Sequence, residues 1–167
     1  MKPLLVVSGI KNIEQAMEAV TIGAVAIGFV FHGEDSIHPE QAREIALSLP
    51  PFISRVGIFK DEPWYSVMEL ATLCSLEVLM FEGTEDEVYL GRFSQHVLKY
   101  GSEQADNFYT VMGISQWRQE MDSGRLIVRC HDVNSINKAQ KVITPFGIEL
   151  RTSSGEDYRK LLVGWQR

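Results

Sequence analysis

The apolar run Gly23-Ala24-Val25-Ala26-Ile27-Gly28-Phe29-Val30-Phe31 contains no charged residue and is bounded by helix-like segments. Uninterrupted runs of this length are typical of parallel strands that helices cover on both faces. The segment before the run has apolar residues at helical spacing, namely Ile13, Ala16, Met17 and Val20. The segment after it, which starts at His38-Pro39, repeats that spacing with Ala42, Ile45, Ala46 and Leu49. The run therefore predicts a buried strand between two covering helices.

The same alternation of strand-like and helix-like segments continues along the whole chain. We predict seven strands, at residues 4–7, 24–31, 55–59, 76–81, 108–114, 125–130 and 147–151. The helices expected between and after them lie at residues 13–20, 39–49, 63–74, 85–100, 116–121, 134–143 and 156–165. This order indicates an α/β fold with parallel strands, in a single domain that covers residues 1–167.

Seven parallel strands fit two architectures, a doubly wound sheet and an incomplete (β/α) barrel. A complete eight-unit barrel typically takes about 250 residues, whereas this chain has 167. The periodicity of the sequence leaves both architectures open.

Composition excludes several classes of partner. The net charge is −6 and the chain has no dense run of Lys or Arg, whereas a nucleic-acid-binding surface needs a basic face. No apolar run reaches the ~20 residues of a membrane span. The apolar part of Met1–Val7 is too short for a secretion signal, so we expect a cytoplasmic protein. Cys74 and Cys130 lack the spacing of a metal site, and we expect neither a metal nor a cofactor.

Three motifs resemble those of a known enzyme family. Val6-Val7-Ser8-Gly9-Ile10-Lys11-Asn12 is similar to the opening of the phosphoribosylanthranilate isomerases, in which a Cys stands at the position of Ser8. The run Gly23–Phe31 is similar to the second strand of that family. Pro145-Phe146-Gly147-Ile148-Glu149 resembles the family's Pro-Phe-Gly-Val-Asp motif. The resemblance is strong for residues 4–85, moderate for residues 126–156, and hardly visible between them.

This resemblance implies a TIM-barrel-like fold of eight (β/α) units. The weakly matched middle of the chain is shorter than the family requires, so we expect a barrel of about seven strands with one βα unit missing or collapsed. An open parallel barrel exposes strand edges. We therefore expect closure by a second copy of the chain, as a homodimer.

The resemblance also implies an intramolecular aldose–ketose isomerase of tryptophan biosynthesis, which catalyses an Amadori rearrangement. The family's base is the Cys at the end of strand one, here Ser8, and a serine hydroxyl is a weak base unless a neighbour activates it. The family's acid is an Asp after strand six, for which the candidates are Asp122 and Asp132. A turn residue and a helix cap, respectively, are the competing interpretations of these two aspartates.

Further candidates lie at positions where the family has other residues. Glu82 replaces a His after strand four and pairs in principle with Ser8, and Cys130 near the end of a strand is a weak candidate for the base. A buried structural role is the competing interpretation of Cys130. The predicted phosphate-binding residues are Gly9, Arg129, Ser153, Ser154 and Gly155, with Arg151 as a further cation. Surface arginines without a ligand are the competing interpretation of Arg129 and Arg151.

The loop after strand two differs from the family in charge. The family presents an Arg there to the carboxylate of anthranilate, whereas residues 32–38 contain no Arg and include Glu34 and Asp35. Two acids repel a carboxylate. Together with the change at Ser8 and with Arg129-Cys130 at the position of the family's Gly-Gly after strand seven, this difference favours a degenerate family member with weak or no isomerase activity that retains sugar-phosphate binding. An active isomerase with substituted catalytic residues and a non-catalytic binding or assembly subunit remain the alternatives.

Overall fold

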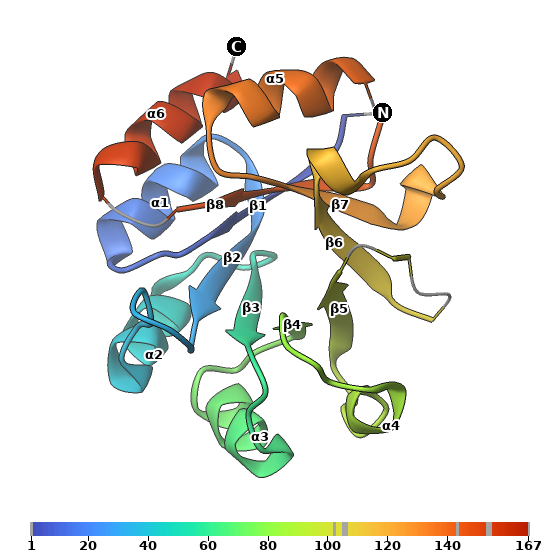
Figure 1. Cartoon of the computed structure of the whole chain (residues 1–167). Coiled ribbons are helices and arrows are strands. Elements are labelled where there is room, and N and C mark those ends of the chain that lie inside the picture. Colours follow the sequence, from blue (N-terminus) through green and yellow to red (C-terminus); the bar gives the residue numbers. More distant parts are fainter. Residues whose placement is uncertain (1, 102, 105–106, 143, 153–154, 167) are drawn as a thin grey trace.

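The computed structural model shows a closed barrel of eight parallel strands in sequential order, with β1 paired to both β2 and β8 (Figure 1). It describes residues 2–101, 103–104, 107–142, 144–152 and 155–166. The strands are β1 (Leu4–Ser8), β2 (Ala24–Val30), β3 (Ser54–Phe59), β4 (Val78–Phe81), β5 (His96–Tyr100), β6 (Tyr109–Gly113), β7 (Leu126–Cys130) and β8 (Gly147–Arg151). The barrel fold is thus confirmed, but the expected count of about seven strands is wrong.

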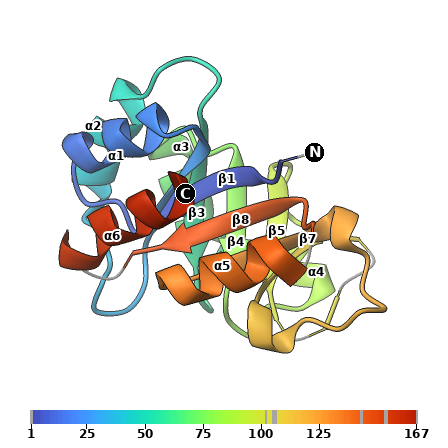
Figure 2. The same cartoon turned by 90° about the horizontal axis from the view of Figure 1, so that it is seen from above.

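Helices, rather than strands, account for the shortness of the chain. Five helices have full length: α1 (Ile13–Thr21), α2 (Pro39–Ser48), α3 (Trp64–Leu73), α5 (Val133–Val142) and α6 (Gly155–Gln166). The helix α4 (Glu87–Leu90) has a single turn, and two 3₁₀ turns (Ile114–Gln116 and Ser123–Arg125) stand between β6 and β7. The side of the barrel at β5 and β6 consequently lacks a covering α-helix among the described residues (Figures 1 and 2).

The predicted helix at residues 85–100 is wrong for the same reason. This segment contains the single turn of α4 and then the whole of β5. The second half of this segment has too few apolar residues to distinguish the 3.6-residue period of a helix from the two-residue period of a strand. A short apolar run fits a helix face and a strand equally well. The missing unit is therefore a missing helix, and strand five is present.

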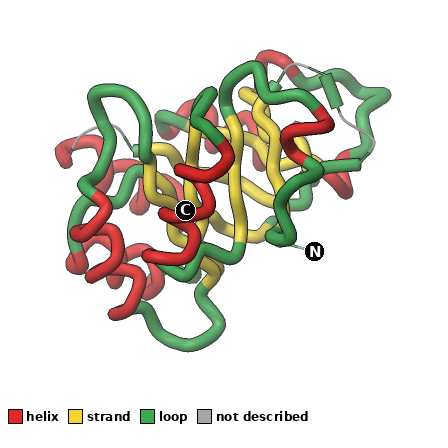
Figure 3. Tube along the Cα trace, turned by 90° about the horizontal axis from the view of Figure 1, so that it is seen from below, coloured by secondary structure: helices red, strands yellow, loops and turns green. Residues whose placement is uncertain are grey.

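Loop side chains replace the absent helices on the outer face of β5 and β6. Val97 and Met112 point away from the barrel axis and are nevertheless buried. Phe93, Phe108 and Trp117 pack in the same apolar cluster, and loops dominate this side of the molecule in Figure 3. Because the barrel is closed and this face is covered, the expected exposed strand edges do not exist.

The N-terminal helices start as the sequence predicts. The side chain of Asn12 accepts a hydrogen bond from the backbone N–H of Gln15, which caps α1. His38 caps α2 in the same way, with Pro39 as the first helical residue. Among the helices that the structure describes, none combines the length and apolar character that a membrane span requires.

The interior of the barrel changes from apolar to charged along its axis. Its lower and middle parts are filled by aliphatic side chains, including Val6, Val56 and Leu98. The layer at the carboxyl ends of the strands holds Arg129 and Glu149 instead, both buried. Barrel interiors are normally packed with branched apolar residues, so a buried charged layer marks this end of the barrel as the candidate site.

Candidate active site at the carboxyl end of the barrel

Six polar side chains from five strands or the loops after them meet at the carboxyl end of the barrel. Active sites of barrel enzymes lie at this end, because all parallel strands finish there. The six side chains, which we name the mouth network, are Ser8 (β1), His32 (after β2), Glu82 (after β4), Arg129 (β7), Glu149 (β8) and Arg151 (β8).

Glu149 is the buried centre of the mouth network. Its carboxylate accepts hydrogen bonds from Ser8 Oγ at 2.5 Å, Arg129 Nε at 2.6 Å and Arg151 Nε at 3.2 Å. Burial alone favours the neutral acid, but Arg129 and Arg151 outweigh it and hold the pKa of Glu149 at about 2. Glu149 is therefore ionised at neutral pH and is a poor proton acceptor.

Glu82 joins the two arginines to a histidine at the rim. Its Oε1 accepts hydrogen bonds from Arg129 Nη2 at 2.5 Å and from Arg151 Nη2, while its Oε2 lies 2.8 Å from His32 Nε2. Burial raises the pKa of Glu82, and the two arginines lower it by more, so the net direction is downward. The side chain of His32 is about one-fifth exposed, whereas that of Glu82 is nearly buried.

The arginines are structural partners of these carboxylates. Arg129 is 7% exposed and its guanidinium lies 4.5 Å from the centre of the Tyr100 ring, within the range of a cation–π contact. The interpretation of Arg129 and Arg151 as surface arginines is thus wrong. Their charges are balanced by Glu82 and Glu149, which makes the four-residue core of the network neutral.

Ser8 fits its place because Gly28 leaves room for its side chain, while Gly9 leaves room for Thr152. Its Oγ donates to Glu149 and accepts from Arg151 Nε at 3.1 Å. A Cβ on Gly28 would lie 2.6 Å from the Cβ of Ser8. A Cβ on Gly9, which has a φ of +85°, would lie 2.1 Å from the carbonyl oxygen of Thr152. The Thr152 hydroxyl donates to the carbonyl oxygen of Ser8 at 3.0 Å, which ties β1 to β8.

Loops that carry His32 and Glu82 are anchored to the barrel. The loop after β2 is closed by a hydrogen bond from the N–H of Ile37 to the carbonyl of Val30 at 2.9 Å. In the loop after β4, Glu85 Oε1 accepts from the N–H of Gly83 at 2.8 Å and from Lys99 Nζ at 3.0 Å. These contacts hold the two loops in the positions that bring His32 and Glu82 together.

Comparison with known proteins shows which enzymes this barrel resembles. No protein-family model matches the chain. Over 94 residues it is 43% identical to the N-(5'-phosphoribosyl)anthranilate isomerase of Moorella thermoacetica, and over 94 residues it is 38% identical to that of Thermotoga neapolitana. Phosphoribosyl anthranilate isomerase from Thermus thermophilus superposes with a TM-score of 0.77 and 25% identity, over 96% of this chain and 97% of that one. The chain is similar to phosphoribosylanthranilate isomerases in sequence over about half of its length and in fold over nearly all of it.

The sequence similarity to this family is confined to part of each protein. The aligned segments cover 56% and 55% of this chain but only 42% and 46% of the two curated relatives, so less than half the length of each is matched. A structure from Thermotoga maritima, described as monomers generated from a dimeric phosphoribosylanthranilate isomerase, superposes with a TM-score of 0.80 at 20% identity. This last likeness concerns the fold.

Two of the candidate catalytic residues lie outside the mouth network. Cys130 is fully buried on the outer side of β7, and burial raises the pKa of its thiol to about 12. Cys130 is therefore a buried apolar side chain at neutral pH, which was the alternative to its role as a base. Asp132 is exposed just before α5, where its carboxylate accepts the N–H of Ser135 at 2.7 Å, the contact of a helix cap.

The aspartate that serves as the acid in phosphoribosylanthranilate isomerases has no counterpart at the end of β6. That strand ends at Gly113 and continues with Ile114, Ser115 and Gln116. Asp122 lies before β7, at the opposite end of the barrel, where it accepts the N–H of Gly124 at 2.9 Å. Ser153 and Ser154 lie outside the described residues, so the phosphate site predicted with Gly9, Arg129 and Gly155 stays a prediction.

Sequence reasoning missed two members of the network, His32 and Glu149. His32 follows β2 directly, and a polar residue at the end of a strand was the available signal. Glu149 stands between the apolar residues Ile148 and Leu150, and its role is visible only once Arg129 and Arg151 are known to be neighbours. Unlike the family, which has a His after strand four, this chain places Glu82 there and brings a histidine from the loop after β2.

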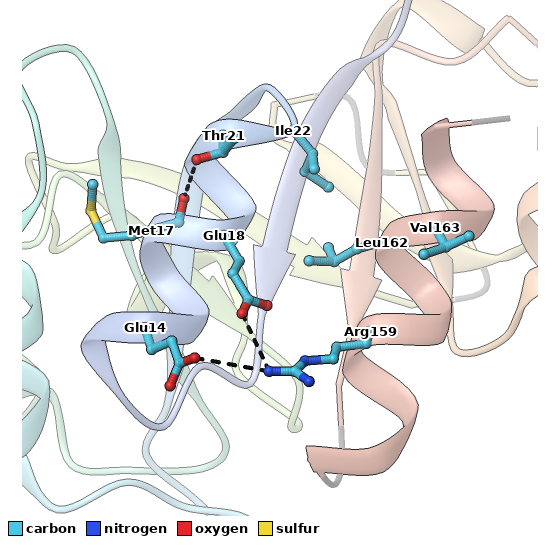
Figure 4. A pocket seen from close by; sticks show the side chains of 8 residues that line it. All are labelled: Glu14, Met17, Glu18, Thr21, Ile22, Arg159, Leu162 and Val163. Atoms are coloured by element: carbon cyan, nitrogen blue, oxygen red, sulfur yellow. Dashed lines mark hydrogen bonds and ion pairs between the residues drawn. The ribbon is translucent and has the colours of Figure 1, made fainter.

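A hollow between α1 and α6 is separate from the mouth network. It is lined by Glu14, Met17, Glu18, Thr21, Ile22, Arg159, Leu162 and Val163 (Figure 4). Arg159 lies 3.8 Å from Glu14 and 3.7 Å from Glu18, and exposed ion pairs of this kind contribute little to stability. The hollow lies on the outside of the barrel, and the two carboxylates that line it are those of Glu14 and Glu18.

Proposed function

We propose that this chain is an isomerase of the phosphoribosylanthranilate isomerase type, which converts a phosphorylated aminoaldose into the corresponding aminoketose through His32 and Glu82. The observation that carries the proposal is the 2.8 Å contact between His32 Nε2 and Glu82 Oε2 at the open rim of the barrel mouth. The family relationship supports the reaction class, which the curated relatives carry in their names.

His32 is the group suited to move the proton. Imidazole is the side chain that ordinarily exchanges protons near neutral pH. Glu82 and Glu149 are held ionised by their arginines and have lowered pKa values, so neither is matched to that task. Glu82 instead fixes one ring nitrogen of His32, which leaves the other nitrogen for the substrate, as the carboxylate does in a catalytic triad.

A single base completes the rearrangement. In the imine formed after ring opening, His32 accepts the proton from C2. The electron pair of that C–H bond forms the C1–C2 double bond, and the π pair of the C1–N bond moves to the nitrogen, which takes a proton from water. The imidazolium then returns a proton to C1, and the C2 hydroxyl gives its proton to water as the ketone forms. Oxidation at C2 and reduction at C1 balance within one molecule, so no cofactor takes part.

The first test measures whether the purified chain converts phosphoribosylanthranilate, with the loss of substrate fluorescence as the readout. We expect turnover that falls by roughly 100-fold or more in His32→Asn, the usual contribution of a general base. A wild-type chain that shows no conversion contradicts the proposal.

One observation favours a second candidate, a degenerate member that retains sugar-phosphate binding without turnover. Every charged group of the mouth network is already paired within the network. The strand-one Cys, the strand-two Arg and the strand-six Asp of the family are all replaced. A preparation that binds a non-reactive analogue of the aminoketose phosphate product but does not convert the substrate would support this candidate. The cytoplasmic location and the place in tryptophan biosynthesis stay predictions.

A further inference from the structure

His131 follows β7 directly, at the carboxyl end of the barrel. Side chains alternate between the two faces of a strand, so His131 lies on the same face as Arg129, which points into the barrel, while Cys130 between them points outwards. The pairing of β7 with β8 joins Cys130 to Leu150, and the residues that follow them lie side by side. His131 therefore lies next to Arg151, one layer further out than Arg129.

The charges around His131 agree with this position. Those that act on its pKa from the barrel belong to Arg129, Glu149 and Arg151 of the mouth network, and the carboxylate of Asp132 acts from its own segment. Partial burial and then Arg129 are the main causes that lower the pKa, and they outweigh the two carboxylates, so it lies below the ordinary value of 6.5. The ring is nevertheless exposed at the open mouth.

His131 differs from His32 in having no fixed partner. The ring of His32 is held by Glu82, whereas that of His131 makes no hydrogen bond or ion pair with any residue that the structure describes. An imidazole without such a partner is available to exchange a proton with a bound molecule.

The end of β6 leaves space beside His131. Gly113 is paired with Arg129 in the register of β6 and β7. A Cβ at Gly113 would lie no closer than 3.7 Å to any atom beyond its two chain neighbours. Tyr100 of β5 borders the same position, since its ring lies against the guanidinium of Arg129. A substrate can therefore approach His131 from within the mouth.

We propose that His131 is a second catalytic residue, the acid that opens the sugar ring before His32 acts, an inference that rests on the proposed function. The lone pair of the amine nitrogen forms the C1–N double bond as the bond from C1 to the ring oxygen breaks. The electron pair of that bond goes to the ring oxygen, which takes a proton from the His131 imidazolium. The nitrogen then gives its proton to the neutral ring, which leaves the imine on which His32 acts.

The charge of the substrate supplies the protonated form of His131. In the free protein the neutral ring prevails at pH 7, because its pKa lies below 6.5. A sugar phosphate brings negative charge into the mouth, and a neighbouring negative charge raises the pKa of a histidine. The imidazolium therefore forms when the substrate is in place.

The first measurement is the turnover of phosphoribosylanthranilate by His131→Ala. We expect kcat to fall by roughly 100-fold, the usual contribution of a general acid. Imidazole added to the solution should restore part of the loss in this variant, which it would not do if His131 were only structural. The matched control is His96→Ala, because His96 is exposed at the start of β5, at the opposite end of the barrel, and this variant should keep the wild-type kcat.

The second measurement is the pKa of His131 by NMR, with and without millimolar ribose 5-phosphate. The resonances of His131 are identified by their loss in His131→Ala. We expect the sugar phosphate to raise the pKa of His131 by about one unit and to leave that of His96 unchanged.

The outcomes separate this inference from the proposed function. A wild-type chain that converts the substrate, with a His131→Ala variant that matches it, overturns the role of His131 and leaves that of His32 intact. Ribose 5-phosphate that does not change the pKa of His131 also overturns it. A wild-type chain without turnover overturns the proposed function, and ring opening by His131 falls with it.

Discussion

At the scale of single residues, the mouth network exchanges the family's reactive groups for a set of fixed charges. Ser8 occupies the position of the catalytic Cys but serves as a hydrogen-bonding partner of Glu149 and Arg151. Paired buried charges are costly to break, because removal of one partner leaves the other unsatisfied. Each residue of the network therefore depends on the others.

Replacement of Ser8 by Cys restores the family residue, and we expect no gain in turnover from it. Ser8 Oγ donates to the carboxylate of Glu149 at 2.5 Å and accepts from Arg151 Nε at 3.1 Å. A Cys at this position would lie between opposite charges and would donate its S–H to Glu149, a hydrogen bond that favours the protonated form. The sulfur would remain a thiol, which is not an effective base. Values of kcat/KM for Ser8→Cys should lie within roughly threefold of the wild type. A tenfold increase would contradict this role of Ser8.

The lowered pKa of Glu149 predicts how the stability of the fold depends on pH. Its pKa of about 2 lies below the ordinary value of 4.5, so its contribution to stability is complete above pH 4.5 and is lost as the pH falls towards 2. The size of this contribution is roughly 3 kcal/mol. Urea unfolding of the wild type at several pH values should show this fall in unfolding free energy between pH 4.5 and pH 2.

The variant Glu149→Gln provides the comparison. At pH 7 it should lose about 3–5 kcal/mol of unfolding free energy, because Arg129 and Arg151 then share only Glu82. Its stability should also change less between pH 4.5 and pH 2 than that of the wild type. Equal stability of the two proteins at pH 7 would show that the network is not energetically coupled.

At the scale of elements, loop side chains cover the outer face of β5 and β6 in place of the absent helices. Phe93 is buried and its ring lies 5.2 Å from that of Phe81 and 5.4 Å from that of Tyr89. We expect Phe93→Ala to cost about 3–5 kcal/mol in urea unfolding. Val88→Ala, at an exposed site in the same segment, should change stability by less than about 0.5 kcal/mol. Similar effects of both changes would mean that this segment does not cover the barrel.

The first three βα units could be predicted from the sequence because strand runs and helical spacing are both long there. In residues 85–125 the strand predicted at 108–114 is present as β6, but β5 was missed, because the helices that normally separate successive strands are reduced to single turns there. Ser8, Glu82 and Arg129 were found from the resemblance to the isomerase family, because they stand where that family has site residues. His32 and Glu149 were missed, since their roles depend on partners 50 and 20 residues away in the chain.

At the scale of the whole molecule, closure of all eight strands within 167 residues preserves the geometry of the mouth. A chain that lost a strand would shift the ends of its neighbours and separate the side chains that meet there. Loss of covering helices changes only the outer surface.

The conversion of phosphoribosylanthranilate by the wild type and by His32→Asn, measured side by side, tests the proposed catalytic pair most directly. We predict turnover in the wild type, and the variant should lose roughly 100-fold or more in kcat. A wild-type chain without turnover, or a variant that matches the wild type, would contradict the assignment of His32 as the base.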